Sequence, residues 1–139
     1  MGEAADIARA YLGVIETKDP ELVRPLLADD YTYTTSDGTT TTGPQAAVDV
    51  MAMYLNAFPD LALETTAIHE AGAVAVTEFI GRGTHTGDLA GIAPTGRRVE
   101  VRVCNVIEVR DGKIAVEREY FDQMSMMAQL GLVPEQAHA

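Results

Sequence analysis

The sequence is short of the residues on which several functional classes depend. It contains one cysteine, Cys104, so an internal disulfide and a metal site of the Cys-x-x-Cys type are both excluded. Its 10 lysines and arginines are outnumbered by 21 aspartates and glutamates, which gives a net charge of −11. Because binding to phosphate groups needs a basic surface, this charge argues against nucleic acid and membranes as partners.

Long apolar runs and well-known functional motifs are also missing. No apolar stretch approaches the roughly 20 residues of a membrane-spanning helix. The acidic start, residues 1–6, lacks the basic region of a secretory signal, so we expect a cytoplasmic protein. There is no glycine-rich phosphate loop, no Gly-x-Ser-x-Gly sequence and no His-Glu-x-x-His sequence. The three histidines, His69, His85 and His138, show no metal-ligand spacing, so no metal site is predicted.

What is present is typical of one α+β domain covering residues 1–139. Hydrophobic residues make up 47% of the chain and charged residues 22%, an ordinary globular composition. Apolar residues recur every three or four positions in the first helix, and alternation with a period of two marks the strands of the second half. The predicted helices cover residues 3–18, 20–28, 44–57 and 124–130, and the predicted strands cover 31–35, 39–42, 61–70, 73–86, 98–110 and 113–122.

The last two strands carry the most informative pattern. In residues 98–110, valine and isoleucine alternate with charged side chains, and only Asn105 interrupts the apolar row. Alternation of this kind is typical of a half-buried strand. Asp111-Gly112 predicts a two-residue hairpin turn, which pairs Arg110 with Lys113.

Continuing this register predicts which polar side chains face the interior. Arg118 lies opposite Asn105, and Tyr120 and Asp122 follow Arg118 on the same face. The interior of the hairpin would then hold Asn105, Arg118 and Asp122. Buried polar groups need partners or a purpose, so this cluster indicates a functional site.

Asp122 has two interpretations that do not exclude each other. It ends a strand just before a helix, where an aspartate caps the free amide groups of the first turn. It could also be a carboxyl group at the mouth of an apolar cavity, where loss of solvent raises its pKa and suits it to proton transfer.

The other candidates also have simple structural explanations. Arg118 could pair with the surface acids Glu117 or Glu119, and Asn105 could bond to neighbouring backbone. Tyr120 could be a core residue, and His85 an ordinary loop residue. These alternatives stay open at the level of the sequence.

Several motifs together resemble the SnoaL-like polyketide cyclase family, of the nuclear-transport-factor-like cone fold. The resemblance covers about residues 5 to 132. It rests on the segments Ala57-Phe-Pro-Asp60, Gly83-Thr-His-Thr-Gly87, Gly91-Ile-Ala-Pro-Thr-Gly96, Asp111-Gly-Lys-Ile114, and Asp122 followed by Gln129-Leu-Gly131.

This resemblance implies a fold and a chemistry. The family fold is a strongly curved antiparallel sheet whose helices close a cone around a ligand pocket. In its cyclases an aspartate at the position of Asp122 is the general acid and base of an intramolecular aldol ring closure, without metal or organic cofactor. The assisting histidine of the family corresponds to Asn105, which can form hydrogen bonds but cannot carry a proton.

Three functional hypotheses follow. The first is an enzyme that cyclises or isomerises an apolar, polyketide-like intermediate, with Asp122 as acid and base. Its substrate would contact Asn105, Arg118, Tyr120, His85, Phe79, Tyr54, Met51 and Tyr11. The second is a non-catalytic module that binds a hydrophobic ligand, with Asp122 acting only as a cap. The third is a hydroxylase or an epoxide-opening enzyme, for which Arg118, Asp122 and, less well, Glu78 are candidates. We also expect a homodimer, because such cones usually bury the outer face of the sheet.

Overall fold

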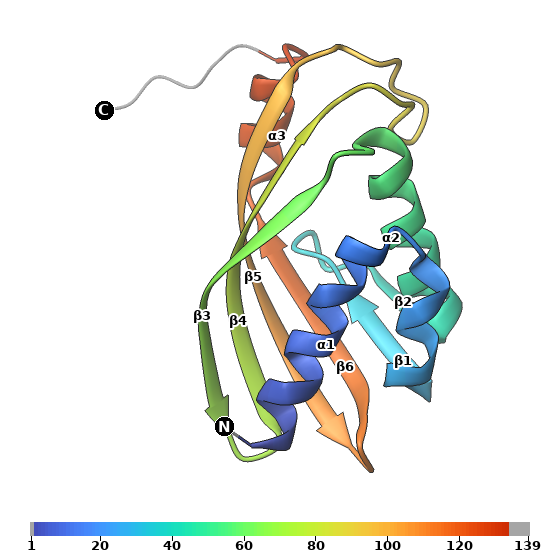
Figure 1. Ribbon diagram of the computed structural model, residues 1–139, viewed down its shortest axis with the longest axis vertical. Helices are drawn as coiled ribbons and strands as arrows, with labels where there is room; N and C mark the ends of the chain where they lie inside the picture. The colour runs from blue at the N-terminus through green and yellow to red at the C-terminus, as the bar shows by residue number, and fades with distance from the viewer. Residues whose placement is uncertain (1, 134–139) are drawn as a thin grey trace.

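A six-stranded curved sheet, with its helices on one side, forms the frame of the protein (Figure 1). The computed structural model describes residues 2–133, so His138 lies outside the described residues. The sheet order is β2-β1-β6-β5-β4-β3. The strands are β1 (Leu27–Thr34), β2 (Thr40–Thr42), β3 (Ala62–Ala71), β4 (Val74–Thr84), β5 (Arg98–Arg110) and β6 (Lys113–Phe121), and the helices are α1 (Glu3–Thr17), η1 (Pro20–Leu26), α2 (Pro44–Ala57) and α3 (Gln123–Gln129).

Helix α1 lies across the concave side of the sheet because one of its faces is apolar (Figure 1). Tyr11, Leu12 and Ile15 are buried on that face and belong to the main core. The helix ends at Lys18, which adopts a left-handed conformation with φ 61°. None of the helices in residues 2–133 is long and apolar enough to span a membrane.

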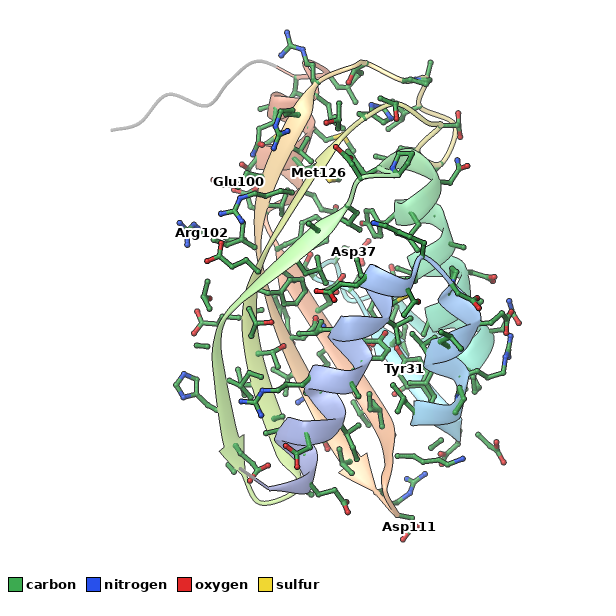
Figure 2. The ribbon with its side chains drawn as sticks, viewed as in Figure 1. Tyr31, Asp37, Glu100, Arg102, Asp111 and Met126 are labelled. Carbon is green, nitrogen blue, oxygen red and sulfur yellow. The ribbon has the colours of Figure 1, made fainter. Side chains whose placement is uncertain are left out.

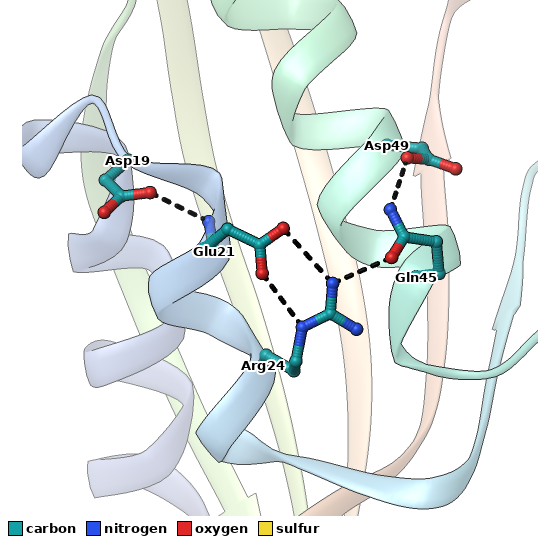
Figure 3. A network of polar contacts seen from close by, with 5 residues as sticks. All are labelled: Asp19, Glu21, Arg24, Gln45 and Asp49. Carbon is teal, nitrogen blue, oxygen red and sulfur yellow. Dashed lines mark hydrogen bonds and ion pairs between the residues drawn. The ribbon is translucent and has the colours of Figure 1, made fainter.

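The segment η1 is a 3₁₀ helix, tied to α2 by a surface network (Figure 3). Asp19 caps it by accepting a hydrogen bond from the backbone amide of Glu21. Arg24 donates to Glu21 within η1 and to Gln45 on α2, at 2.8 Å for the second contact. These contacts join η1 to α2 on the surface of the protein.

The predicted antiparallel sheet is wrong in one respect: β1 pairs with β6 in parallel. The other four neighbouring pairs are antiparallel. The parallel contact places Tyr33 beside Glu117 and Thr34 beside Arg118. Two tyrosines from the first third of the chain, Tyr31 and Tyr33, therefore lie next to the last strand.

The β5–β6 hairpin begins as predicted and then departs from the predicted register. Asp111 and Gly112 form the turn with positive φ angles, and Arg110 pairs with Lys113. A bulge follows, in which Val109 pairs with Ile114 but Glu108 pairs with Val116. The extra residue, Ala115, turns every later side chain of β6 to the opposite face, because side chains alternate along a strand.

The bulge corrects the predicted hairpin interior. Asn105 lies opposite Glu119 instead of Arg118. Phe121, rather than Tyr120, lies opposite Val103. The inner face of β6 therefore carries Glu117, Glu119 and Phe121, whereas Arg118 and Tyr120 are on the outer face.

The long loop between β4 and β5 folds closely onto the end of α2. Gly87 has no room for a side chain, because a Cβ atom there would lie 1.9 Å from the carbonyl oxygen of Asn56. Gly83 packs against Phe58 in the same way, with a Cβ distance of 2.9 Å. Close packing thus explains two glycines of the Gly83–Gly87 segment: Gly87 in the loop meets the end of α2, and Gly83 near the end of β4 meets Phe58, which follows α2.

Helix α3 is held against the uncovered end of β5 by one side chain. The amide of Gln129 accepts from the backbone N–H of Glu100 at 2.7 Å and donates to its carbonyl oxygen at 3.0 Å. The side chain of Gln129 thereby forms the hydrogen bonds that a neighbouring strand would form with Glu100, where β6 no longer pairs with β5. Met126 and Leu130 then pack with Phe58 into a second apolar cluster at this end of the molecule.

Candidate active site

An internal cavity of about 130 Å³ lies between the concave face of the sheet and the helices. Most of its wall is apolar, which is typical of small-molecule sites. Its polar groups come from Tyr11, Tyr33, Tyr54, Asn105, Glu117 and Glu119. Among the described residues that line it there is no lysine, arginine or histidine. The polar part of the wall can therefore carry negative charge but has no side chain to neutralise an anionic ligand.

Glu117 is the most deeply placed acid of this wall, with 1% of its surface exposed. Its Oε1 accepts hydrogen bonds from the hydroxyls of Tyr11 and Tyr31, at 2.7 and 2.5 Å. Its Oε2 accepts from Asn105 Nδ2 at 3.0 Å. These donors come from α1, β1 and β5, so one carboxyl group joins three elements to β6. Figure 2 shows Tyr31 on the helix side of the sheet, opposite to the side from which Arg102 projects.

Glu119 lies two residues further along the same face and is less enclosed. It is half-buried, and its Oε1 accepts from the Tyr33 hydroxyl at 2.7 Å. Asn105 lies directly opposite on β5, and opposite residues of an antiparallel pair have Cβ atoms roughly 5 Å apart. Asn105 therefore stands between the two acids.

Burial keeps this pair of carboxyl groups from losing both protons at ordinary pH. Burial raises the pKa of Glu119, although its Tyr33 and Asn105 contacts oppose the change. Burial and the nearby charge of an ionised Glu119 raise the pKa of Glu117 to about 7, against the effect of its three donors. Two like charges this close in a medium of low polarity repel strongly, so the pair keeps one proton up to about neutral pH.

Tyr54 brings a hydrogen-bond donor to the same cavity from α2. Burial, and the negative charge of Glu119, raise the pKa of its hydroxyl to about 12, so the hydroxyl keeps its proton. Tyr33 has a raised pKa for the same two reasons. A carboxyl group that exchanges protons and a phenol that donates a hydrogen bond thus share one apolar cavity.

Two of the predicted substrate contacts are corrected by the structure. Arg118 lies on the outer face and donates to Glu108 at 2.5 Å. Tyr120 is 46% exposed on the same face. The cause is the bulge at Ala115, which reverses the side-chain alternation of β6. Glu78, the weaker candidate on β4, is also exposed on the outer face.

Asp122 performs the capping role that its position before a helix predicted. It is exposed, and its Oδ1 accepts from the backbone amide of Ser125 at 3.0 Å, which caps α3. It does not belong to the cavity wall. An acid/base role for Asp122 stays a prediction, and its surroundings do not provide the apolar cavity on which that prediction depended.

His85 is fully buried but lies outside the cavity wall. Its Nδ1 accepts from the backbone amide of Thr95, and its ring packs on Phe58 with centroids 5.5 Å apart. It therefore anchors the β4–β5 loop. Four other predicted contacts do lie on the wall, namely Tyr11, Met51, Tyr54 and Phe79. Their part in substrate binding is a prediction.

The sequence analysis missed Glu117 and Glu119 as interior residues. Alternation alone could not find them, because either register of β6 places charged side chains inside. A useful signal was the Tyr31-Thr-Tyr33 segment. Two inward tyrosines on a neighbouring strand need hydrogen-bond acceptors, and acids on the inner face of β6 supply them.

Comparison with known proteins agrees with this geometry. The family model for SnoaL-like polyketide cyclase matches residues 5–130. Nogalonic acid methyl ester cyclase from Streptomyces nogalater is 32% identical over 91 residues, covering 65% of this chain and 68% of that enzyme. Aklanonic acid methyl ester cyclase DauD from Streptomyces sp. (strain C5) is 32% identical over 90 residues, covering 64% of this chain but only 56% of that enzyme.

A solved structure with the same architecture is IdmH from Streptomyces antibioticus. It superposes with a TM-score of 0.79 at 27% identity, covering 94% of this chain and 99% of that one. The resemblance to the cone fold is thus confirmed by the curved sheet with its helices and by the comparisons. This chain belongs to the SnoaL-like polyketide cyclase family.

Proposed function

We propose that the protein catalyses the ring closure of a neutral, apolar, polyketide-like substrate, with Glu119 as general acid and base. The observation that carries this proposal is a pair of neighbouring carboxyl groups, Glu117 and Glu119, on the wall of a mostly apolar cavity. The named cyclases that resemble this chain act on methyl esters. A methyl ester suits the cavity, because a free carboxylate would lose its water there without gaining a cationic partner.

The geometry supports a reaction in which one carboxyl group both takes and returns a proton. The carboxylate of Glu119 takes the proton of the enol hydroxyl while the enol carbon of the substrate forms the new carbon–carbon bond. Glu119, now neutral, gives this proton to the oxygen of the accepting carbonyl group, so the product is an isomer of the substrate and the carboxylate is regenerated. Tyr54 is placed to donate a hydrogen bond to a substrate oxygen during this step.

The test compares two acids under identical conditions. Wild type, Glu119→Gln and Asp122→Asn are incubated with nogalonic acid methyl ester and with aklanonic acid methyl ester, and products are separated by chromatography with mass detection. We expect an isomeric product from wild type and Asp122→Asn, and a loss of about 10²–10⁴-fold in Glu119→Gln. Asparagine also caps helices, so Asp122→Asn should preserve α3. Full activity in Glu119→Gln, or its loss only in Asp122→Asn, would return the acid/base role to Asp122.

The binding-module alternative predicts a different pattern. In that case both esters bind without conversion, and Glu119→Gln changes affinity alone. Calorimetric titration of wild type with each ester, beside the product assay, separates binding from turnover. Binding without any product from either ester would count against catalysis of these ring closures.

The epoxide-opening alternative depended on Arg118 in the interior, and Arg118 lies on the outer face. A product that gains water or an oxygen atom would nevertheless favour that alternative or a hydroxylase over ring closure. A cytoplasmic location and a homodimer are further proposals. The exposed outer face of β4, β5 and β6 is the surface on which we expect a second copy to pack, and its test is the molar mass in solution.

A further inference from the structure

A groove of about 260 Å³ lies between α1 and β3, next to the internal cavity. Three apolar side chains line both spaces, namely Leu12, Ile15 and Leu63. The other residues of the groove are exposed, namely Arg9, Gly13, Glu16 and Thr65. A single layer of apolar side chains therefore separates the cavity from the groove.

Helix α1 and strand β3 are tied together on either side of this groove. Near the start of α1, the backbone amide of Ala5 donates to Oε2 of Glu70 at 2.8 Å. Just beyond the end of α1, Nζ of Lys18 donates to the carbonyl oxygen of Leu61 at 2.8 Å. The spacing of the two elements is thus held at both ends, and the groove between them is part of the folded frame.

Gly13 leaves part of the groove unfilled. It lies exposed within α1, and a Cβ atom there would meet no other atom within 4 Å. Glycine is less favourable than alanine in a helix interior, and no contact of α1 requires it at this position. A side chain at position 13 would occupy the groove, so the glycine keeps open a space that the protein itself does not use.

Leu63 is the side chain at which the cavity can open into the groove. It is half-buried and lies opposite Gly81 on β4. A Cβ atom on Gly81 would lie 3.6 Å from Leu63 Cδ2, and its absence gives Leu63 room to turn. Side chains that are not fully enclosed change rotamer within nanoseconds, so this opening needs no movement of the backbone.

The size of the cavity makes such an opening necessary for a substrate with several rings. The cavity measures about 130 Å³. An apolar cavity of about 150 Å³ holds one benzene molecule. Sites for larger ligands enclose about 300–1,000 Å³, a range that the cavity and the groove reach only together.

We propose that the substrate site continues from the cavity into this groove, and that Gly13 determines the size of the substrate. One ring lies in the cavity, and the oxygen-bearing remainder of a neutral polycyclic substrate lies in the groove. Arg9 donates there to a carbonyl oxygen and Glu16 accepts from a hydroxyl group, because the ion pair of Arg9 with Asp6 is long and exposed, at 3.6 Å. This inference rests on the proposed function only for the ring in the cavity.

Two probes that are not turned over separate the cavity from the groove. Phenol has one ring, whereas a dihydroxyanthraquinone has three fused rings with carbonyl and hydroxyl oxygens. Their dissociation constants are measured for wild type and Gly13→Leu, by NMR titration for phenol and by absorbance titration for the anthraquinone. The matched control is Ala10→Leu, which adds a leucine at an exposed position of α1 outside the groove.

We expect Gly13→Leu to weaken binding of the anthraquinone by about 10–100-fold, the loss expected when one ring loses its apolar contacts. Binding of phenol should not change, and Ala10→Leu should change neither constant. Thermal unfolding should show Gly13→Leu to be at least as stable as wild type, because leucine favours a helix more than glycine does. Gly13→Met, with a more flexible side chain, is the second variant and should give the same pattern.

Equal anthraquinone affinity in wild type and in the folded Gly13 variants would overturn the proposal. Failure of the anthraquinone to bind wild type would overturn it as well. Arg9→Met keeps the length of the side chain without its donors and should weaken the anthraquinone alone, by about 3–10-fold. An unchanged constant in Arg9→Met would overturn the placement of the oxygen-bearing end.

The product assay with the methyl esters is judged separately. Esters that are not converted, beside the expected probe affinities, would count against ring closure and leave the groove in place. Conversion by wild type, beside probe affinities that Gly13→Leu does not change, would count against the groove alone.

Discussion

The two faces of the β5–β6 hairpin hold acids in opposite surroundings. On the outer face, Glu108 pairs with Arg118, and Glu100 pairs with Arg82 at 2.7 Å. On the inner face, the hydrogen-bond donors to Glu117 and Glu119 are neutral side chains, and Glu117 is buried while Glu119 is half-buried. The same residue type is therefore a surface ion-pair partner on one face and a proton-holding group on the other.

The difference shows that partners and solvent decide what a glutamate can do, and that a single inserted residue decides which surroundings it meets. If Ala115 were instead paired with Glu108, with no bulge, Arg118 would lie opposite Asn105 on the inner face and the two acids would lie on the outer face. An arginine there would stabilise negative charge and lower the pKa of any nearby carboxyl group. The bulge thus determines whether this wall holds a proton or a fixed positive charge.

The largest expected difference between the faces is in packing. Ile107 is fully buried on the inner face, and its neighbour Val106 is half-buried on the outer face. We expect Ile107→Ala to lower the free energy of unfolding by about 2–5 kcal/mol, because it leaves a cavity in the core. Val106→Ala should cost about 1 kcal/mol or less. Urea denaturation of both variants measures this, and equal losses would contradict the assignment of the faces.

The second difference is in the response to pH. A buried acid with a raised pKa binds its proton more tightly in the folded protein than in the unfolded chain. Between the ordinary glutamate pKa of 4.5 and about 7, raising the pH therefore lowers the stability of the fold. For the fully buried Glu117 the loss across this window amounts to about 3 kcal/mol.

Urea unfolding at pH 5, 6, 7 and 8 tests this dependence. Glu117→Gln should flatten the fall in stability across the window, since only one interior acid is left. Glu78→Gln is the matched control, because Glu78 is exposed on the outer face. It should keep the slope of the wild type. An equally steep slope in Glu117→Gln would show that the interior pair is not its source.

A third difference concerns tyrosine hydroxyls. Tyr31 is buried and donates to the carboxyl of Glu117, whereas Tyr120 is 46% exposed. We expect Tyr31→Phe to cost about 1.5–3 kcal/mol at pH 8, above the pKa of Glu117, because it removes a hydrogen bond to a charged group. Tyr120→Phe should change the stability by less than about 0.5 kcal/mol. Thermal unfolding of the two variants gives the comparison, and similar values would argue that the Tyr31 contact is weak.

Most of the fold could be predicted from the sequence because it depends on local patterns. Helix α2 and strand β5 have the bounds that were predicted from the sequence, and Asp111-Gly112 forms the predicted turn. The parallel pairing of β1 with β6 could not be predicted in this way. It joins segments some 80 residues apart, and no local pattern records which strands become neighbours.

The candidate site was predicted only in part, for a related physical reason. Asn105 was recognised because it interrupts an apolar row. The two acids were missed because a bulge adds a residue without changing the local composition, and the face of every later residue then depends on that one position. Asp122 was recognised by its place before a helix, which identifies a cap well and an active site poorly.

The smallest expected effect is that of the outer ion pair. Arg118 and Glu108 have side chains that are 34% and 41% exposed, so water and salt weaken their attraction. We expect Arg118→Ala to lower the free energy of unfolding by about 1 kcal/mol or less, and the loss to shrink as sodium chloride is raised. It should also leave turnover unchanged, since Arg118 does not reach the cavity. A large loss of turnover in Arg118→Ala would show that this arginine does reach the site. It would also favour the pairing of β5 with β6 that has no bulge.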